Sequence, residues 1–181
     1  MLVFGDSLSA GYGIAVQQSW PALLAERLQR EKLPYSVINA SISGETTAGG
    51  RTRLPTVLKH HRPAVVILAL GANDGLRGLP VTESRANLAQ MARAAKAAGA
   101  RVLLVGMQLP PNYGPSYTRD FAALFSTVAK QEKTALLPFL LEPIALDDAA
   151  FQADRLHPTA AAQPKILDHV WKSLKPLLKP R

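Results

Sequence analysis

The sequence predicts an α/β protein in which helices cover both faces of a mainly parallel sheet, forming a three-layer α/β/α sandwich. Five short apolar runs alternate with stretches of helical periodicity, which is the order of elements that parallel sheets with crossover helices require. The run at residues 65–70 is almost wholly apolar, as expected for a central strand covered on both faces. With 181 residues, 48% of them hydrophobic, the chain fits a single domain over residues 1–181.

The individual elements follow from the spacing of apolar residues and from helix boundary signals. Strands are expected at residues 2–4, 35–38, 65–70, 102–105 and 135–137, and helices at residues 20–32, 54–61, 87–98, 121–129 and 166–174. Ser19 is a candidate N-cap, Gly99 is a C-terminal stop, and Pro176 should interrupt the last helix. Two long irregular segments remain, at residues 108–118 and 138–157, and loops of that length in a compact domain are often functional.

Composition excludes several classes of protein. The chain has no cysteine, which removes disulfides, thiolate catalysis and zinc–thiolate sites. It has no apolar run of the roughly 18 residues that a membrane span needs, and its N-terminus lacks the pattern of a signal peptide. The net charge of +8 favours anionic partners such as phospholipid surfaces. The basic clusters within residues 51–62 and 165–181 are interpreted as solvated helix faces without the aromatic platform that base stacking requires, so no nucleic-acid binding is expected.

Residues suited to acyl transfer follow the predicted strands. In an open parallel sheet, ligands bind at the carboxyl ends of the strands. There the sequence places Ser7, Gly44, Asn73 and, after the long final loop, Asp154 and His157. A serine hydroxyl, an imidazole and a carboxylate form a nucleophilic triad, and Asp154 and His157 are close enough in sequence for one turn to join them. The N–H groups of Ser7 and Gly44, with the Asn73 amide, could supply an oxyanion hole.

Each of these residues also has a purely structural explanation. A serine after Gly-Asp is commonly part of a turn or a helix cap, a loop glycine serves a positive-φ turn, and Asn-Asp-Gly is ordinary turn chemistry. Asp154 could merely cap the turn that precedes His157. The prediction of catalysis depends on the conjunction, because all of these residue types are expected at the same edge of one sheet.

Four sequence blocks resemble those of the GDSL, or SGNH, hydrolase family. They are Gly5-Asp6-Ser7-Leu8, Gly44, Gly71-x-Asn73-Asp74 and Asp154-x-x-His157-Pro158, in the family's order and over nearly the whole chain. The resemblance implies a flavodoxin-like fold with Ser7 as nucleophile, His157 as base and Asp154 as its orienting acid. It also implies that Ser7, Gly44 and Asn73 form the oxyanion hole, and that no metal or other cofactor is needed.

The resemblance extends to the substrate. Through residues 39–46, 73–78 and 109–114 it is strongest to bacterial members that hydrolyse aryl esters, acyl-CoA thioesters and lysophospholipids, which implies a small-molecule acyl ester or thioester as substrate. It implies a periplasmic or secreted location, with the cytoplasm left open; a monomer is expected, and the positive charge suggests weak association with anionic lipid surfaces. The residues implied to bind substrate are Gly75, Leu76, Arg77, Gly78, Leu109, Pro110 and Tyr113.

Three other functions are weighed against this one. A carbohydrate or small-ester acetylesterase would use the same triad on a shorter acyl group. A flavodoxin-like module that binds a nucleotide or anion without chemistry has slight support, because Gly11-Tyr12-Gly13 begins a dinucleotide fingerprint that Val16 breaks. A metalloenzyme is disfavoured because the histidines form no H-E-x-x-H or comparable ligand set. The serine block also lacks the second glycine of G-x-S-x-G, which argues against the nucleophile elbow of ordinary α/β-hydrolases.

Overall fold

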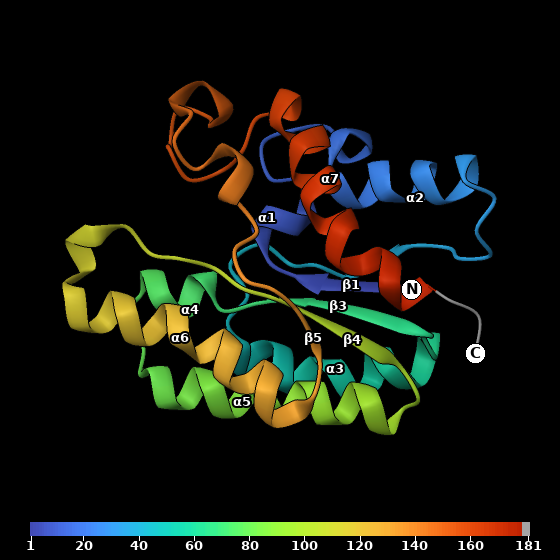
Figure 1. Cartoon of the computed structure of the whole chain (residues 1–181), viewed down its shortest axis with the longest axis horizontal. Helices are drawn as coiled ribbons and strands as arrows, with labels where there is room; N and C mark the ends of the chain where they lie inside the picture. Colours follow the sequence, from blue (N-terminus) through green and yellow to red (C-terminus); the bar gives the residue numbers. More distant parts are fainter. Residues whose placement is uncertain (179–181) are drawn as a thin grey trace.

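The sheet has the strand order of a flavodoxin-like fold. The computed structural model describes residues 1–178, and its five strands are all parallel, in the order β2-β1-β3-β4-β5 (Figure 1). The strands are β1 (Leu2–Gly5), β2 (Ile38–Asn39), β3 (Val65–Ala69), β4 (Arg101–Val105) and β5 (Ala135–Leu137). In this order the switch point, where ligands bind, lies between β1 and β3.

Helices cover both faces of the sheet, which confirms the predicted three-layer sandwich. α2 packs against α7 on one face, and α5 lies between α3 and α6 on the other (Figure 1). The α-helices are α1 (Ser7–Ala10), α2 (Trp20–Arg30), α3 (Thr47–His61), α4 (Ala72–Leu76), α5 (Val81–Ala97), α6 (Pro115–Glu132) and α7 (Gln163–Leu174). Shorter 3₁₀ segments are η1 (Val16–Gln18), η2 (Pro111–Tyr113), η3 (Glu142–Ile144), η4 (Asp148–Ala150), η5 (Ala160–Ala162) and η6 (Lys175–Leu178). No helix within residues 1–178 is long and apolar enough to cross a membrane.

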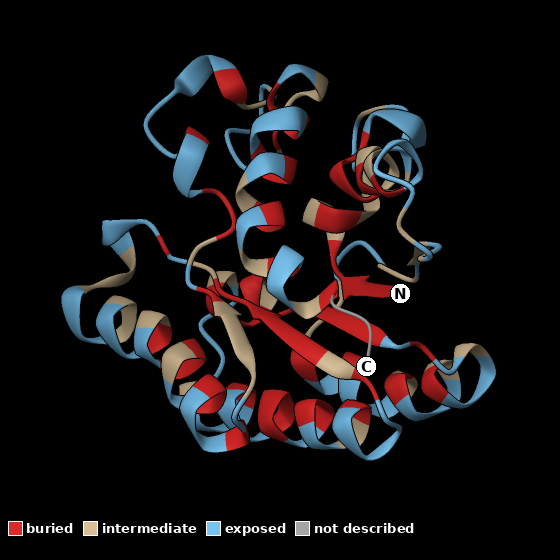
Figure 2. Cartoon of the chain, turned by 45° about the vertical axis from the view of Figure 1, so that its right-hand side comes forward, coloured by how far each residue is buried: buried red, intermediate tan, exposed pale blue. Residues whose placement is uncertain are grey.

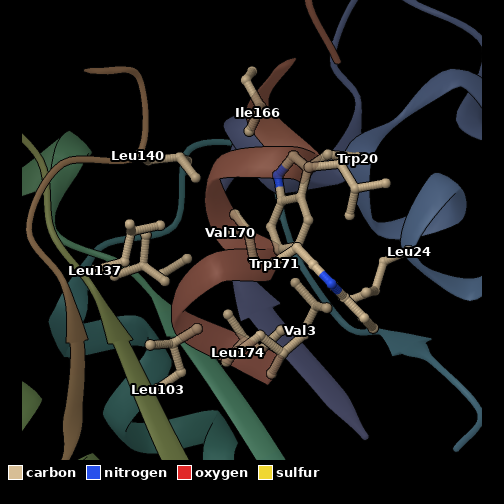
Figure 3. Close-up of a cluster of buried hydrophobic side chains, with 14 of the residues drawn as sticks. Val3, Trp20, Leu24, Leu103, Leu137, Leu140, Ile166, Val170, Trp171 and Leu174 are labelled. Atoms are coloured by element: carbon tan, nitrogen blue, oxygen red, sulfur yellow. The ribbon is translucent and has the colours of Figure 1, made fainter. Parts of the chain in front are cut away.

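The sheet divides the core in two, because successive strand side chains point to opposite faces. Val3 packs with Trp20 and Trp171 in the cluster beneath α2 and α7 (Figure 3), whereas Leu2 and Phe4 pack toward α3, α5 and α6. Figure 2 shows the central strands β1, β3 and β4 buried along almost their full length, whereas the edge strands β2 and β5 are partly exposed. Polar side chains can therefore collect only at the ends of the strands.

Several predicted boundaries are wrong, each for a local reason. β2 starts at Ile38 rather than at residue 35, because Ile38 already pairs with Leu2 at the start of β1 and the residues before it have no strand beside them. α5 starts at Val81 and α6 at Pro115, each about two turns earlier than expected, because their first turns are largely exposed and carry no apolar period. α3 likewise extends N-terminally to Thr47, where Thr46 caps it by accepting a hydrogen bond from Gly49 N–H.

Ser19 occupies the N-cap position of α2 but does not cap it. Its hydroxyl donates to the Val16 carbonyl at 2.6 Å, while the N–H of Trp20 is bound by the side-chain oxygen of Gln163 at 2.9 Å. A residue from α7 thus supplies an acceptor for the first N–H of α2, and the Ser19 side chain supplies none. α7 ends before Pro176, as predicted, and Lys179 and Arg181 of the C-terminal basic cluster lie outside the described residues.

Two short helices at strand ends, α1 and α4, were not predicted. α1 is capped by Asp6 and ends at Gly11, whose φ is 80°. α4 begins after Gly71, whose φ of 122° favours glycine, so the Asn73-Asp74-Gly75 run is helical rather than a simple turn. Both helices are too short to show an apolar period. Each places its first turn directly at the carboxyl end of a strand.

Candidate active site

Ser7 lies just beyond β1, as the first residue of α1. Asp6 before it is buried, and its side chain accepts a hydrogen bond from Leu8 N–H at 3.0 Å. The N–H of the first residue of a helix has no acceptor within the helix. Ser7 therefore presents both a hydroxyl and a main-chain N–H at the switch point of the sheet.

A turn in the segment after β5 brings His157 and Asp154 to Ser7. His157 Nε2 lies 2.8 Å from Ser7 Oγ, and His157 Nδ1 lies 2.6 Å from Asp154 Oδ2. The other carboxylate oxygen of Asp154 accepts hydrogen bonds from the N–H groups of Leu156 and His157, both at 3.0 Å. Arg155, inside the turn, has a left-handed φ of 57°. One carboxylate thus holds both the backbone and the ring of the histidine.

Gln152 ties this turn to the N-terminal part of the chain. Its side-chain nitrogen donates to the carbonyls of Tyr12 at 2.8 Å and Pro158 at 2.9 Å, and its N–H donates to the His157 carbonyl at 2.8 Å. The Tyr12 ring lies 4.4 Å from the His157 ring, centre to centre. The sequence had not singled out Gln152 or assigned Tyr12 to the site. The one available signal was that Gln152 lies in the long segment before His157, where a side-chain amide can bridge carbonyl groups.

Further donors come from the segments after β2 and β3. Gly44 has a φ of 80°, and its carbonyl accepts a hydrogen bond from Arg77 at 3.1 Å. Asn73 donates through Nδ2 to the Glu45 carbonyl at 3.0 Å, and because an amide NH₂ carries two hydrogens, one remains for a ligand. Ser7, Gly44 and Asn73 all line the same cavity, so the site can surround an oxyanion with fixed donors.

A buried polar network that the sequence did not indicate lies behind these donors. Asp74 is 3% exposed and accepts hydrogen bonds from Thr47 N–H at 2.9 Å, from the Thr47 hydroxyl at 2.5 Å and from the Ser84 hydroxyl at 3.1 Å. Asn87 donates to the Thr47 hydroxyl oxygen at 3.0 Å. Such donors offset the desolvation of a buried carboxylate. The network joins α3, α4 and α5, and so fixes the two segments that carry Gly44 and the Asn73 amide.

The pKa values of two carboxyl groups near Ser7 are shifted in opposite directions. Burial raises the pKa of Asp6 to about 6, against the opposing effects of the Leu8 N–H and the His157 charge. Hydrogen bonds from the His157 N–H and ring, and from Leu156 N–H, lower the pKa of Asp154 to about 2. Asp154 is therefore ionised at neutral pH and favours the histidine tautomer that carries its proton on Nδ1. Nε2 is then free to accept the Ser7 proton.

A cavity of about 670 Å³ opens beside Ser7. Much of its wall comes from the segment after β5, through Phe139, Leu141, Leu146, Phe151 and Leu156. Its volume is typical of pockets that bind small organic molecules. Residues 138–157 were expected to be functional because of their length, but the individual wall residues were not identified, since apolar side chains in an irregular segment give no periodic signal.

The residues implied to bind substrate fall into two groups. Leu76, Leu109 and Pro110 line the cavity, whereas Gly75, Arg77, Gly78 and Tyr113 lie outside its wall. Tyr113 donates its hydroxyl to the Leu76 carbonyl at 3.0 Å. Gly75 is tightly packed, since a Cβ there would lie 2.6 Å from Phe121 and 2.9 Å from Leu109. Gly75 and Tyr113 therefore lie against the wall residues Leu109 and Leu76 and do not line the cavity themselves.

The flavodoxin-like fold and the hydrogen bonds that link Ser7, His157 and Asp154 define the class of protein as an SGNH-type ester hydrolase. Comparison of this chain with known proteins agrees with that class. The model of the GDSL-like Lipase/Acylhydrolase family matches residues 3–163. The chain is 53% identical to Esterase TesA of Pseudomonas aeruginosa, over 98% of this chain and 89% of that protein. It is 44% identical to Thioesterase 1/protease 1/lysophospholipase L1 of Escherichia coli, over 98% and 84% of the two chains. A crystal structure of TesA, 54% identical, matches with a TM-score of 0.95 over 98% of both chains. The chain therefore belongs to the GDSL-like lipase/acylhydrolase family and is a hydrolase of ester bonds.

Proposed function

We propose that this single-domain enzyme is a serine esterase that hydrolyses carboxylic esters and thioesters through an acyl-enzyme on Ser7. His157 acts as the general base and Asp154 as its orienting acid. The observation that carries the proposal is the unbroken chain from Asp154 through both ring nitrogens of His157 to Ser7 Oγ, with contacts of 2.6 and 2.8 Å. These distances suit proton transfer from the hydroxyl to the imidazole.

The reaction then has two halves. Ser7 Oγ bonds to the acyl carbon while its proton passes to His157 Nε2, and the developing oxyanion is bound by the N–H groups of Ser7 and Gly44 and the free amide hydrogen of Asn73. The bond to the leaving oxygen or sulfur breaks as that atom takes the proton from His157. Water then attacks the acyl-enzyme with His157 again as base, releasing the carboxylic acid and restoring Ser7.

Ser7→Ala tests the nucleophile. We expect kcat on p-nitrophenyl butyrate to fall by about 10⁴-fold or more with the fold unchanged. Ser116→Ala, at an exposed serine of α6, is the matched control and should keep full activity. An organophosphonate should label the wild type on Ser7 and leave the alanine variant unlabelled. Near-wild-type turnover by Ser7→Ala would refute the proposal.

The substrate class is proposed to be acyl esters and thioesters with chains longer than acetyl, including aryl esters, acyl-CoA and lysophospholipids. The apolar side chains around the 670 Å³ cavity and the names of the two relatives, an esterase and a thioesterase and lysophospholipase, support this. A series of p-nitrophenyl esters should show kcat/KM rising from acetyl to medium chains. A strict acetyl preference would instead favour the alternative, a carbohydrate or small-ester acetylesterase.

We also propose that the enzyme works as a monomer in the periplasm or outside the cell, and that it associates weakly with anionic lipid surfaces. The family resemblance supports the location, and the net charge of +8 supports the association with lipid. Sedimentation velocity measures the oligomeric state, and cell fractionation measures the location.

A further inference from the structure

An ion pair that the sequence did not indicate joins the segment that carries Gly44 to α3. Glu45 follows Gly44 and its side chain is 9% exposed, while Arg53 lies in α3 with a side chain that is 25% exposed. Arg53 Nε lies 3.3 and 3.2 Å from the two carboxylate oxygens of Glu45, and Arg53 Nη2 donates to Oε2 as well. Such a pair adds little net stability, because desolvation offsets the attraction, but the forked guanidinium fixes the position of the carboxylate.

Arg53 also connects Glu45 to the strand that leads to Ser7. The guanidinium carbon of Arg53 lies 4.1 Å from the centre of the Phe4 ring, and Phe4 is fully buried in β1. A guanidinium is attracted to an aromatic face, most strongly where water is excluded. Glu45 is therefore anchored to the core of the sheet. Arg53 does not lie on a solvated helix face, as was expected for the basic cluster within residues 51–62.

The main chain of Glu45 in turn orients the Asn73 amide. The Glu45 carbonyl accepts a hydrogen bond from Asn73 Nδ2 at 3.0 Å, and the Glu45 N–H donates to the Ile42 carbonyl at 3.2 Å. Because a carbonyl only accepts, the first contact selects the amide orientation in which the nitrogen, with its second hydrogen, is held in place. A reversed amide would put its oxygen there, and an oxygen repels an oxyanion instead of donating to it.

We infer that Glu45 and Arg53 are positioning residues that hold the Asn73 amide as a donor to the oxyanion. The inference rests on the proposed function, because it requires an oxyanion at the acyl carbon. Neither Glu45 nor Arg53 lines the cavity, so their effect should fall on the transition state and not on substrate binding. The Asp74 network fixes the backbone of the same region, whereas the Glu45–Arg53 pair fixes the carbonyl that orients one side chain.

Glu45→Ala tests the inference on turnover of p-nitrophenyl butyrate. We expect kcat and kcat/KM both to fall by about tenfold to hundredfold with KM nearly unchanged, because acylation and deacylation each pass through an oxyanion. The Ki of an alkyl trifluoromethyl ketone, whose adduct with Ser7 carries an oxyanion, should rise by a similar factor. An ion pair with a purely structural role would move neither the kcat of the folded enzyme nor this Ki.

Glu132→Ala is the matched control for the loss of a buried ion pair. The side chain of Glu132 is 7% exposed, and its Oε1 lies 2.5 Å from Arg93 Nη1 in a pair that joins α5 and α6. Both alanine variants should unfold at a lower urea concentration, but Glu132→Ala should keep the wild-type kcat and Ki. If Glu45→Ala also kept them, the Glu45–Arg53 pair would be structural only and the inference would be overturned.

Arg53→Lys keeps the positive charge and removes the fork, so it is the milder variant if Glu45→Ala fails to fold. It should lower kcat by about threefold to tenfold at an unchanged KM. Wild-type kcat and Ki in folded Arg53→Lys would overturn the inference as well.

A double-mutant cycle tests whether the effect passes through Asn73. In an Asn73→Ala background the donor is already absent, so Glu45→Ala should lower kcat by no more than about twofold. An undiminished loss in that background would overturn the inference. Failure of the proposed function has a different signature, since Ser7→Ala would then retain turnover. If Ser7→Ala is inactive while Glu45→Ala keeps the wild-type kcat and Ki, only the present inference fails.

Discussion

The two sides of the active site are held in different ways. Behind the predicted oxyanion donors, Asp74 is 3% exposed and bonded to Thr47 and Ser84 within a network that spans three helices. On the other side, the side chain of Asp154 is 39% exposed and holds His157 through a single turn. Fixed donors stabilise an oxyanion because they need no reorganisation. A base must exchange protons with leaving groups and water, which an exposed turn allows.

This difference separates stability from activity. The donor side is built into the core, so damage to it should lower both the free energy of unfolding and kcat. The acid–base side is joined to the fold mainly by Gln152 and by the turn itself, so damage to it should lower kcat far more than the free energy of unfolding. The following variants test that separation.

The largest effect is expected from His157→Ala. Loss of the base should lower kcat by about 10⁴-fold, because no other imidazole lies beside Ser7 within residues 1–178. The free energy of unfolding in urea should change little. His60→Ala, at an exposed histidine of α3, is the control and should leave both quantities unchanged. A large loss of stability in His157→Ala would break the comparison.

Asp74→Ala should act on both quantities. It leaves the Thr47 N–H and the hydroxyls of Thr47 and Ser84 without their acceptor in a buried site, which should lower the free energy of unfolding by about 3–5 kcal/mol. The remaining folded enzyme should show a lower kcat with little change in KM, since the donors lose their support. Asp120→Ala, at an exposed position of α6, serves as control. Normal stability together with lower kcat would show that the network does not anchor the fold.

The smallest effect concerns the pH dependence of stability at Asp6. Its pKa is raised from 3.8 to about 6, so the folded protein holds this proton more tightly than the unfolded chain. The contribution of Asp6 to stability is therefore lost as pH rises through about 4 to 6, by at most about 3 kcal/mol. Asp6→Asn keeps a capping oxygen and removes the titration.

Urea unfolding at about pH 4 and pH 7 measures this effect. The free energy of unfolding of Asp6→Asn, relative to the wild type, should be higher at pH 7 than at pH 4. Asp154→Asn should behave in the opposite way: its free energy of unfolding, relative to the wild type, should rise on acidification. The lowered pKa of Asp154 stabilises the wild-type fold above about pH 4, and this contribution fades toward pH 2. If the difference in unfolding free energy between Asp6→Asn and the wild type did not change with pH, the raised pKa of Asp6 would be contradicted.

The sequence predicted the sheet well, because the apolar runs at β3 and β4 are short and bounded by helical patterns. The placement of residues after strands explains why Ser7, Asn73 and His157 lie around one cavity. Spacing alone predicted that one turn would join Asp154 to His157, and the distance of 2.6 Å agrees with that geometry.

What the sequence could not predict depends on contacts between distant segments. Thr47 and Ser84 lie in different helices, and no local pattern around either one indicates that both donate hydrogen bonds to Asp74. Likewise, no local pattern around Gln152 indicates its hydrogen bond to Tyr12. The first turns of α5 and α6 were missed because exposed turns carry no apolar period. Side-chain pairing across the fold, rather than local periodicity, determines these features.

The distance along the chain between Ser7 and His157 has a consequence for biosynthesis. The two side chains that share a hydrogen bond are 150 positions apart, and Gln152 meets Tyr12 across 140. The ribosome delivers the chain from its N-terminus, so the proposed nucleophile and oxyanion donors emerge long before the proposed base, and a domain folds as a unit. On the proposed mechanism, the nascent chain would stay inert toward esters until its last segment docks, so that hydrolysis would begin only once His157 is in place.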